Sequence, residues 1–235
     1  NREDYLKTIN PLLINVKKIF ISESKRRDWG MTGDIILPGI DIDDYGGYRG
    51  ANPLVLRVGN LMKERDLMMG FTASESILSG LPSVTLGLNP NIRGSRISSG
   101  FDDLLDHYRS LRVYLHTTAN DYEDGYNLSL LEAMAVGMPV ISIANKTSPI
   151  INGINGYISD DIQYLRTCVA RLLDDPVLAN SLGQKARETV REKFSQIKFL
   201  QLWIKSIEVA IVEFLERSTK ELPKKDIGLN TQPEN

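Results

Sequence analysis

Apolar residues alternate between strand-like and helix-like spacing along most of the chain. Short runs rich in aliphatic and β-branched residues occupy positions 54–58, 83–88, 112–117, 139–143 and 156–159. Apolar residues at helical spacing predict helices at 63–78, 101–109, 129–136, 161–173, 176–194 and 195–216. Strands that alternate with helices across short connections are typical of βαβ units. The pattern therefore predicts an α/β fold with a doubly wound, Rossmann-like parallel sheet.

The two ends of the chain differ from this regular middle. Two short strands are predicted at 16–22 and 35–40, with a helical turn at 24–29 between them. The stretch 41–51 is rich in Asp, Gly and Tyr, which indicates a hinge or linker. The polar end of the chain predicts a disordered tail. We therefore divide the chain into an N-terminal piece with the hinge (1–45), a main domain (46–195), a C-terminal helix (196–221) and a tail (222–235).

Composition and charge narrow the classes of function. The 235 residues carry a formal net charge of −2, which gives no electrostatic reason to expect nucleic acid as a partner. The single cysteine excludes an internal disulfide, and two histidines are too few for a histidine-rich metal site. No apolar run approaches the ~18 residues of a membrane span. We expect a cytoplasmic protein and leave open a peripheral contact with a membrane. A chain that starts at Asn1 can be a fragment of a longer protein.

The stretch 123–142 combines an acidic, glycine-containing loop, a helix start, a Gly-Met-Pro stop and a strand. Backbone N–H groups at a helix start hold phosphate, and carboxylates accept pairs of sugar hydroxyls. Asp124 on the loop and Glu132 in the helix are spaced to converge on one ligand. Glu123 is out of that register and is interpreted as a solvated loop acid. The stretch suits an anionic ligand that also carries sugar hydroxyls.

The loop between the two acids has a functional and a structural interpretation. Gly125 would let the backbone approach a ligand, and the N–H groups of Asn127 and Leu128 would face its anion. The alternative is an ordinary N-terminal turn. For Glu132 the alternative is a capping box, in which Ser129 caps the helix and Glu132 bonds back to the backbone.

The block 104–194 resembles the C-terminal, donor-binding half of retaining glycosyltransferases of family 4 (group 1), which have the GT-B fold. The family motif Glu-Gly-Phe-Gly-x-x-x-x-Glu-Ala-Met-Ala-x-Gly-x-Pro-Val is matched by residues 124–140. The resemblance implies that Glu132 binds the nucleotide ribose and that Asp124, a departure from Glu, contacts the donor sugar. Tyr126 takes the aromatic position, and Asn127 replaces the glycine whose backbone donates to phosphate.

A second family landmark, Gly-Arg-x-x-x-x-Lys-Gly, follows the first strand of the main domain. Its Arg and Lys bind the donor diphosphate in the family. Here the stretch begins at Gly59, Asn60 replaces the Arg, and Arg65 falls at the Lys position with Lys63 close by. The alternative for the two cations is a solvated helix start. Ile150 replaces a family acid and cannot make a polar contact.

The resemblance implies transfer of a hexose from a nucleotide diphosphate sugar to a hydroxyl of a saccharide or lipid-linked acceptor, with retention. Asp124, Glu132 and Arg65 would carry the chemistry, without a metal or other cofactor. Residues 36–41 resemble the hinge between GT-B domains, so most of the N-terminal acceptor domain would be missing or supplied by a partner subunit. The alternatives are a nucleotide-sugar-binding module that is inactive alone, or a GT-B relative such as a sugar-nucleotide epimerase or a phosphorylase.

Overall fold

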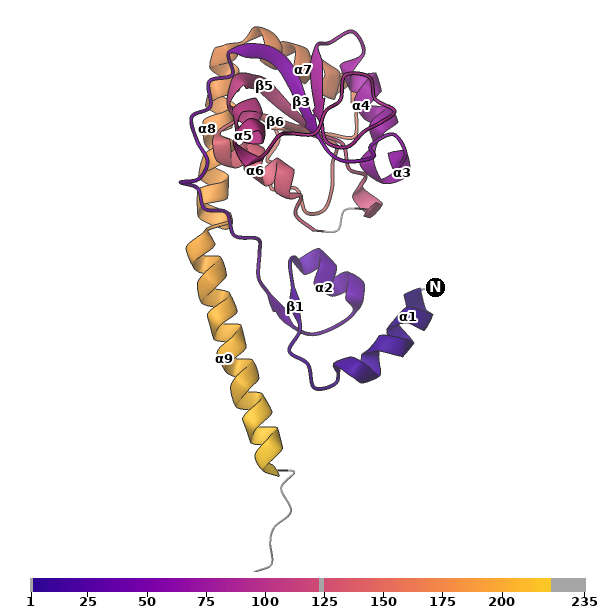
Figure 1. Cartoon of the computed structure of the whole chain (residues 1–235), viewed down its shortest axis with the longest axis vertical. Helices are drawn as coiled ribbons and strands as arrows, with labels where there is room; N and C mark the ends of the chain where they lie inside the picture. The colour runs from indigo at the N-terminus through magenta and orange to yellow at the C-terminus, as the bar shows by residue number, and fades with distance from the viewer. Residues whose placement is uncertain (1, 123–124, 221–235) are drawn as a thin grey trace, which may run out of the picture.

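The computed structural model describes residues 2–122 and 125–220. Its main domain is built on a five-stranded sheet in the order β4-β3-β5-β6-β7 (Figure 1). All neighbouring strands run parallel, so the predicted doubly wound parallel sheet is confirmed. The strands are β3 (Asn52–Val58), β4 (Ser83–Leu86), β5 (Leu111–His116), β6 (Val140–Ser142) and β7 (Tyr157–Ile158).

Helices cover both faces of this sheet because successive side chains of a strand point to opposite faces. In β5, Tyr114 packs on the side of α5 and α6, whereas Val113 and Leu115 pack on the side of α4 and α7. Helix α8 contacts both clusters. The helices that build these layers are α4 (Phe71–Leu78), α5 (Phe101–Ser110), α6 (Leu128–Val136), α7 (Ile162–Asp174) and α8 (Pro176–Lys193).

The strand order reverses between β3 and β5. From β3 the chain continues to β4 on one side, and from β5 it continues through β6 to β7 on the other. In open parallel sheets, ligands bind outside the carboxyl ends of the strands at such a switch point. The loops after Val58 and after His116 are therefore the expected walls of a binding site.

The predicted single helix at 63–78 is wrong. The chain forms two short helices, α3 (Asp66–Met69) and α4, which are separated at Gly70. Gly70 has a φ of 60° and caps α3, and a Cβ there would overlap the carbonyl oxygen of Thr117. Close packing against the end of β5 thus breaks a helix that apolar spacing alone predicts to be continuous.

The N-terminal piece forms a separate small unit beside the long helix α9 (Gln196–Lys220), below the sheet in Figure 1. It contains α1 (Arg2–Ile9), a 3-10 helix (Asn10–Leu13), β1 (Ile19–Phe20), α2 (Glu23–Trp29) and β2 (Asp34–Ile35), with β1 and β2 parallel. The predicted strand at 35–40 is wrong beyond β2, because Gly39 packs against Phe199 of α9 and Ile40 makes only an isolated bridge to Ser195. Helix α1 was not predicted.

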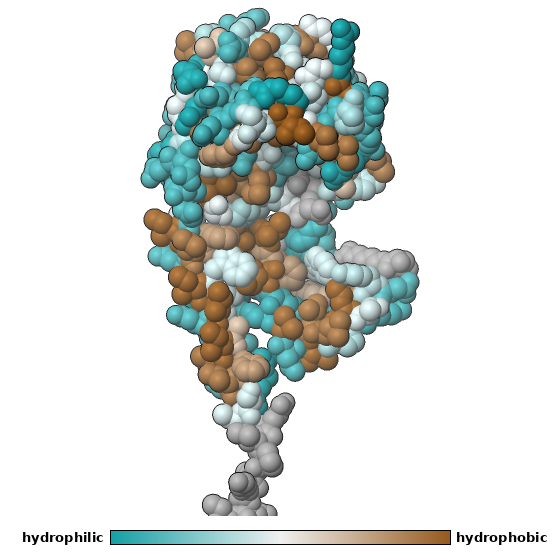
Figure 2. All heavy atoms as spheres, in the orientation of Figure 1, coloured by the Kyte–Doolittle hydropathy of each residue, from teal (hydrophilic) through white to brown (hydrophobic). Residues whose placement is uncertain are grey.

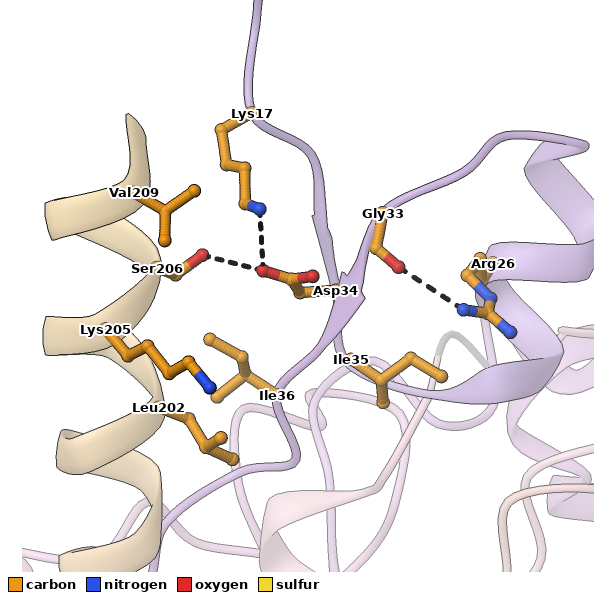
Figure 3. A pocket seen from close by; sticks show the side chains of 10 residues that line it. All are labelled: Lys17, Arg26, Gly33, Asp34, Ile35, Ile36, Leu202, Lys205, Ser206 and Val209. Atoms are coloured by element: carbon orange, nitrogen blue, oxygen red, sulfur yellow. Dashed lines mark hydrogen bonds and ion pairs between the residues drawn. The ribbon is translucent and has the colours of Figure 1, made fainter. Parts of the chain in front are cut away.

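Polar contacts join this N-terminal unit to α9. Asp34 accepts a hydrogen bond from the Ser206 hydroxyl at 3.1 Å and pairs with Lys17 at 3.0 Å (Figure 3). These contacts, the one to Lys17 first, lower the pKa of Asp34. A cavity of about 420 Å³ lies beside them.

Within the described ranges, no helix combines the length and the apolar character needed to cross a membrane.

The stretch 41–51, called here the connecting segment, lies against the sheet domain. The Arg187 guanidinium donates to the Ile42 carbonyl at 2.9 Å, and Arg109 donates to the Gly46 carbonyl at 2.6 Å. Farther along, the Tyr48 hydroxyl donates to the Arg112 carbonyl at 2.7 Å. The segment is therefore fastened to α8, α5 and β5 along its length.

Candidate functional site

Glu132 lies one turn into α6 and makes no capping box. The cap of α6 is Asn127, whose side-chain oxygen accepts a hydrogen bond from the Leu130 N–H at 3.0 Å. Ser129 is already inside the helix. The capping-box interpretation is therefore wrong, and the Glu132 carboxylate is available for other partners.

Two tyrosine hydroxyls hold the Glu132 carboxylate. Tyr108 of α5 donates to Oε2 at 3.1 Å, and Tyr45 of the connecting segment donates to Oε1 at 3.5 Å. Burial raises the pKa of Glu132, and the bonds from Tyr108 and Tyr45 partly offset this. Burial also raises the pKa of Tyr45 to about 12 and that of Tyr108 well above its usual value, so both hydroxyls remain donors near neutral pH. Each carboxylate oxygen keeps a lone pair for a further hydroxyl group.

The Asn127 cap gives a prediction for stability. Asn127→Ala removes the acceptor for an N-terminal N–H of α6, and we expect a loss of about 1 kcal/mol in the free energy of unfolding. Asn127→Asp is the matched control, because aspartate caps helices about as well. Denaturant titration measures both variants. An alanine variant with the wild-type midpoint would show that the cap does not support α6.

The loop after β3 is tied to the loop after β4. The Asn60 side-chain oxygen accepts from the Leu88 N–H at 2.7 Å, and the Asn89 side-chain amide donates to the Gly59 carbonyl at 2.7 Å. Leu61 has a φ of 52°, which is the only positive φ of a non-glycine residue in the described part of the chain. Such strained backbone is often found at binding sites. Asn60, which the resemblance aligns with a family arginine, thus has a structural role: its hydrogen bond to Leu88 fixes this loop.

Two cations project from the same region. Lys63 and Arg65 are exposed, and neither forms an ion pair with a carboxylate among residues 2–122 and 125–220. Arg65 precedes α3, and its guanidinium lies 2.8 Å from the Met68 sulfur. No hydrogen bond connects either cation with Glu132 in that part of the chain. Positive charge without an ion-pair partner among the described residues thus lies in the loop after β3, and the held carboxylate lies on α6.

The loop before α6 is packed by the chain itself. Gly125 has a φ of 136°, and a Cβ there would collide with the Ile21 side chain of the N-terminal unit. The Gly125 carbonyl accepts from the Thr147 hydroxyl at 2.6 Å. Tyr126 packs edge-on against Phe194 with ring centroids 4.9 Å apart, whereas Leu128 is exposed. In this structure, the missing Cβ of Gly125 leaves room for the Ile21 side chain.

Positions 123, 124 and 150 concern the acidic residues that the sequence analysis considers for this site. Asp124 and Glu123 lie outside the described residues. Ile150, at the position of a family acid, is buried in the core around α6. No group of three or more His, Cys, Asp or Glu side chains in the described ranges could hold a metal ion.

Tyr45 and Tyr108 are not predicted from the sequence. Tyr45 lies in a polar stretch that was interpreted as a linker, and its ring packs edge-on against Phe101 at the start of α5 with centroids 5.7 Å apart. Tyr108 has no exposed surface and has the position of a core residue. The signal that could have identified them is chemical, because a buried phenol requires an acceptor for its hydroxyl.

Part of the chain matches a family of known proteins. The family model described as "Glycosyl transferases group 1" matches residues 83–175, which run from β4 to the end of α7 and include Glu132. This part of the chain is therefore similar to glycosyl transferases group 1. Part of the chain is 34% identical over 95 residues to the poly(ribitol-phosphate) alpha-N-acetylglucosaminyltransferase of Staphylococcus aureus (strain COL), covering 38% of this chain and 19% of that protein.

Solved structures share the fold of this chain. A variant of S. aureus TarM in complex with fondaparinux, alpha-GlcNAc-glycerol and UDP has a TM-score of 0.68 and 21% identity, covering 87% of this chain and 46% of that chain. Anabaena HepE in complex with UDP-glucose has a TM-score of 0.71 and 14% identity, covering 88% and 68%. These likenesses bear out the predicted fold, a parallel sheet with helices on both faces. The chain spans just under half of the TarM chain and about a fifth of the curated relative.

Proposed function

We propose that this chain binds the nucleotide diphosphate sugar in a retaining glycosyltransferase that moves a hexose to an acceptor hydroxyl. The observation that carries the proposal is the Glu132 carboxylate in α6, the helix that follows β5, where two tyrosines hold it. Glu132 would accept the ribose hydroxyls. Support comes from relatives: TarM and HepE were solved with UDP and UDP-glucose, and the curated relative is named as an alpha-N-acetylglucosaminyltransferase.

Lys63 and Arg65 would hold the diphosphate together with the start of α6. The N-terminal end of a helix carries partial positive charge and free N–H groups, and the Leu128 N–H belongs to this end. Charge develops on the diphosphate as it leaves the sugar, so preorganised cations and dipoles would lower the barrier. Asp124 would contact the sugar hydroxyls, although it lies outside the described residues.

The acceptor would be a saccharide or a lipid-linked hydroxyl bound with the help of a further α/β domain or partner subunit. Among its described residues the N-terminal unit has a sheet of two parallel strands, whereas parallel sheets are normally covered on both faces. Helix α9 also exposes apolar residues at a spacing of three and four, and apolar side chains gather along it in Figure 2. They are Ile197, Leu200, Ile204, Ile207, Ile211 and Phe214. We propose that the further domain packs on these surfaces and that residues 1–45 belong to it.

Calorimetric titration with UDP, GDP and ADP tests the donor site. We expect one site per chain for at least one of these nucleotides, with affinity that weakens as salt rises because cations hold the diphosphate. A donor-hydrolysis assay with the UDP, GDP or ADP sugar of the bound nucleotide then separates an enzyme from the alternative, a binding module that is inactive alone. A folded chain that binds none of the three nucleotides would contradict the proposed function.

A further inference from the structure

We propose that Tyr45 and Tyr108 are positioning residues, which hold the Glu132 carboxylate in the orientation that accepts the ribose hydroxyls. The proposal rests on the donor site proposed above. The two tyrosines come from different elements and reach different oxygens of the same carboxylate. A carboxylate bonded on both oxygens cannot rotate without breaking a hydrogen bond, so its remaining lone pairs have fixed directions.

Packing fixes the Tyr108 ring. Its side chain is fully buried, and the ring packs against Tyr114 of β5 with centroids 6.1 Å apart. The ring therefore cannot swing toward solvent to satisfy its hydroxyl elsewhere. Glu132 supplies the acceptor, and Tyr108 in turn limits the positions that Glu132 can take.

Hydrogen bonds hold the backbone before and after Tyr45. Arg187 holds the Ile42 carbonyl before it, and Arg109 holds the Gly46 carbonyl after it. The Tyr45 ring also rests edge-on against Phe101. Because this segment connects the N-terminal unit with the sheet domain, a displacement of the segment would change the contact that Glu132 receives.

The tyrosines stabilise the charged form of Glu132, which burial opposes. The groups that face it are Tyr45 from the connecting segment and Tyr108 from α5, with Tyr114 behind Tyr108 and Asp44 beside Tyr45. Within the described ranges, no Arg, Lys or His forms an ion pair with Glu132. Hydrogen bonds to a carboxylate favour its ionised form, so removal of either hydroxyl raises the pKa of Glu132.

The test compares Tyr108→Phe and Tyr45→Phe with Tyr48→Phe as the matched control. Tyr48 lies in the same connecting segment, but its hydroxyl donates to the Arg112 carbonyl and not to Glu132. Calorimetric titration with the nucleotide that the wild type binds, from pH 5 to 8, should show affinity lost as pH falls through the pKa of Glu132. We expect Tyr108→Phe to bind about tenfold more weakly at pH 7, and to lose affinity at a higher pH than the wild type. The control should follow the wild type.

A second measurement needs no nucleotide. Carbon-13 NMR titration of the glutamate carboxyl signals, with the Glu132 signal assigned by its absence in Glu132→Gln, should show a higher pKa in both Tyr→Phe variants than in the control. Tyr45→Phe keeps the test decisive if Tyr108→Phe does not fold. If the wild type binds nucleotide and both variants keep its pKa and its affinity, the positioning role is overturned. If the wild type binds none of the nucleotides, the proposed function fails, and the NMR titration still decides whether the tyrosines hold the carboxylate.

Discussion

Glu132→Gln should weaken nucleotide binding by about a hundredfold while the protein stays folded. Glutamine has the shape of glutamate and can bond to both tyrosines, but its amide supplies one acceptor oxygen instead of two. One ribose hydroxyl would then face an N–H donor, and the charge that strengthens both bonds would be lost. Calorimetric titration measures the affinity, and circular dichroism checks the fold. Wild-type affinity in the folded variant would show that Glu132 does not contact the nucleotide.

The same substitution should make the protein more stable at neutral pH. Burial raises the pKa of Glu132, so the folded state binds more protons than the unfolded state between the two pKa values. The wild type therefore loses stability as pH rises from the unfolded pKa through the folded one. Glutamine removes this loss, so we expect the variant to be more stable than the wild type at pH 7 and no more stable at pH 4, below the ordinary pKa of glutamate. Denaturant titration at the two pH values measures it.

Gly183→Ala should destabilise the fold more than the other substitutions considered. Gly183 lies where α8 crosses the end of α6, and a Cβ there would overlap the carbonyl oxygen of Gly137. Gly137 has a φ of 94° and closes α6, so its backbone has little freedom to move away. The helices would have to separate, at a cost of about 3 kcal/mol in the free energy of unfolding.

Gly100→Ala is the matched control for this prediction. A Cβ at Gly100 meets no atom within 4 Å, and the residue has an extended backbone with a φ of 162°. Denaturant midpoints of the two variants separate close helix packing from the general effect of replacing a glycine. Equal midpoints would show that α6 and α8 tolerate a wider separation than the structure indicates.

The sequence predicted the parallel sheet because each strand between 54 and 143 is a short apolar run followed by a clear change of spacing. It failed where a distant contact overrides local preference. Gly70 breaks a helix because Thr117 lies against it, and spacing along the chain carries no trace of that contact. Helix capping was mispredicted for a simpler reason, since Asn127 and Ser129 are both good caps and only the structure selects Asn127.

The candidate site was predicted only in part. Glu132 could be selected because its motif is local, and the structure places it in α6, the helix that follows β5. Its partners could not be predicted, since Tyr45 lies 87 positions away and Tyr108 lies 24 positions away along the chain. The role of Asn60 was also hidden, because its hydrogen bond crosses to Leu88 in the loop after the neighbouring strand.

Mapping the bound nucleotide by NMR tests the central claim most directly. Backbone amide signals of the labelled wild-type chain would be followed while UDP, or whichever nucleotide binds in calorimetry, is added. We expect the largest shifts in the loop 59–65 and at the start of α6 through Glu132. Shifts confined to the cavity between β2 and α9, or a bound nucleotide that leaves α6 unchanged, would contradict it.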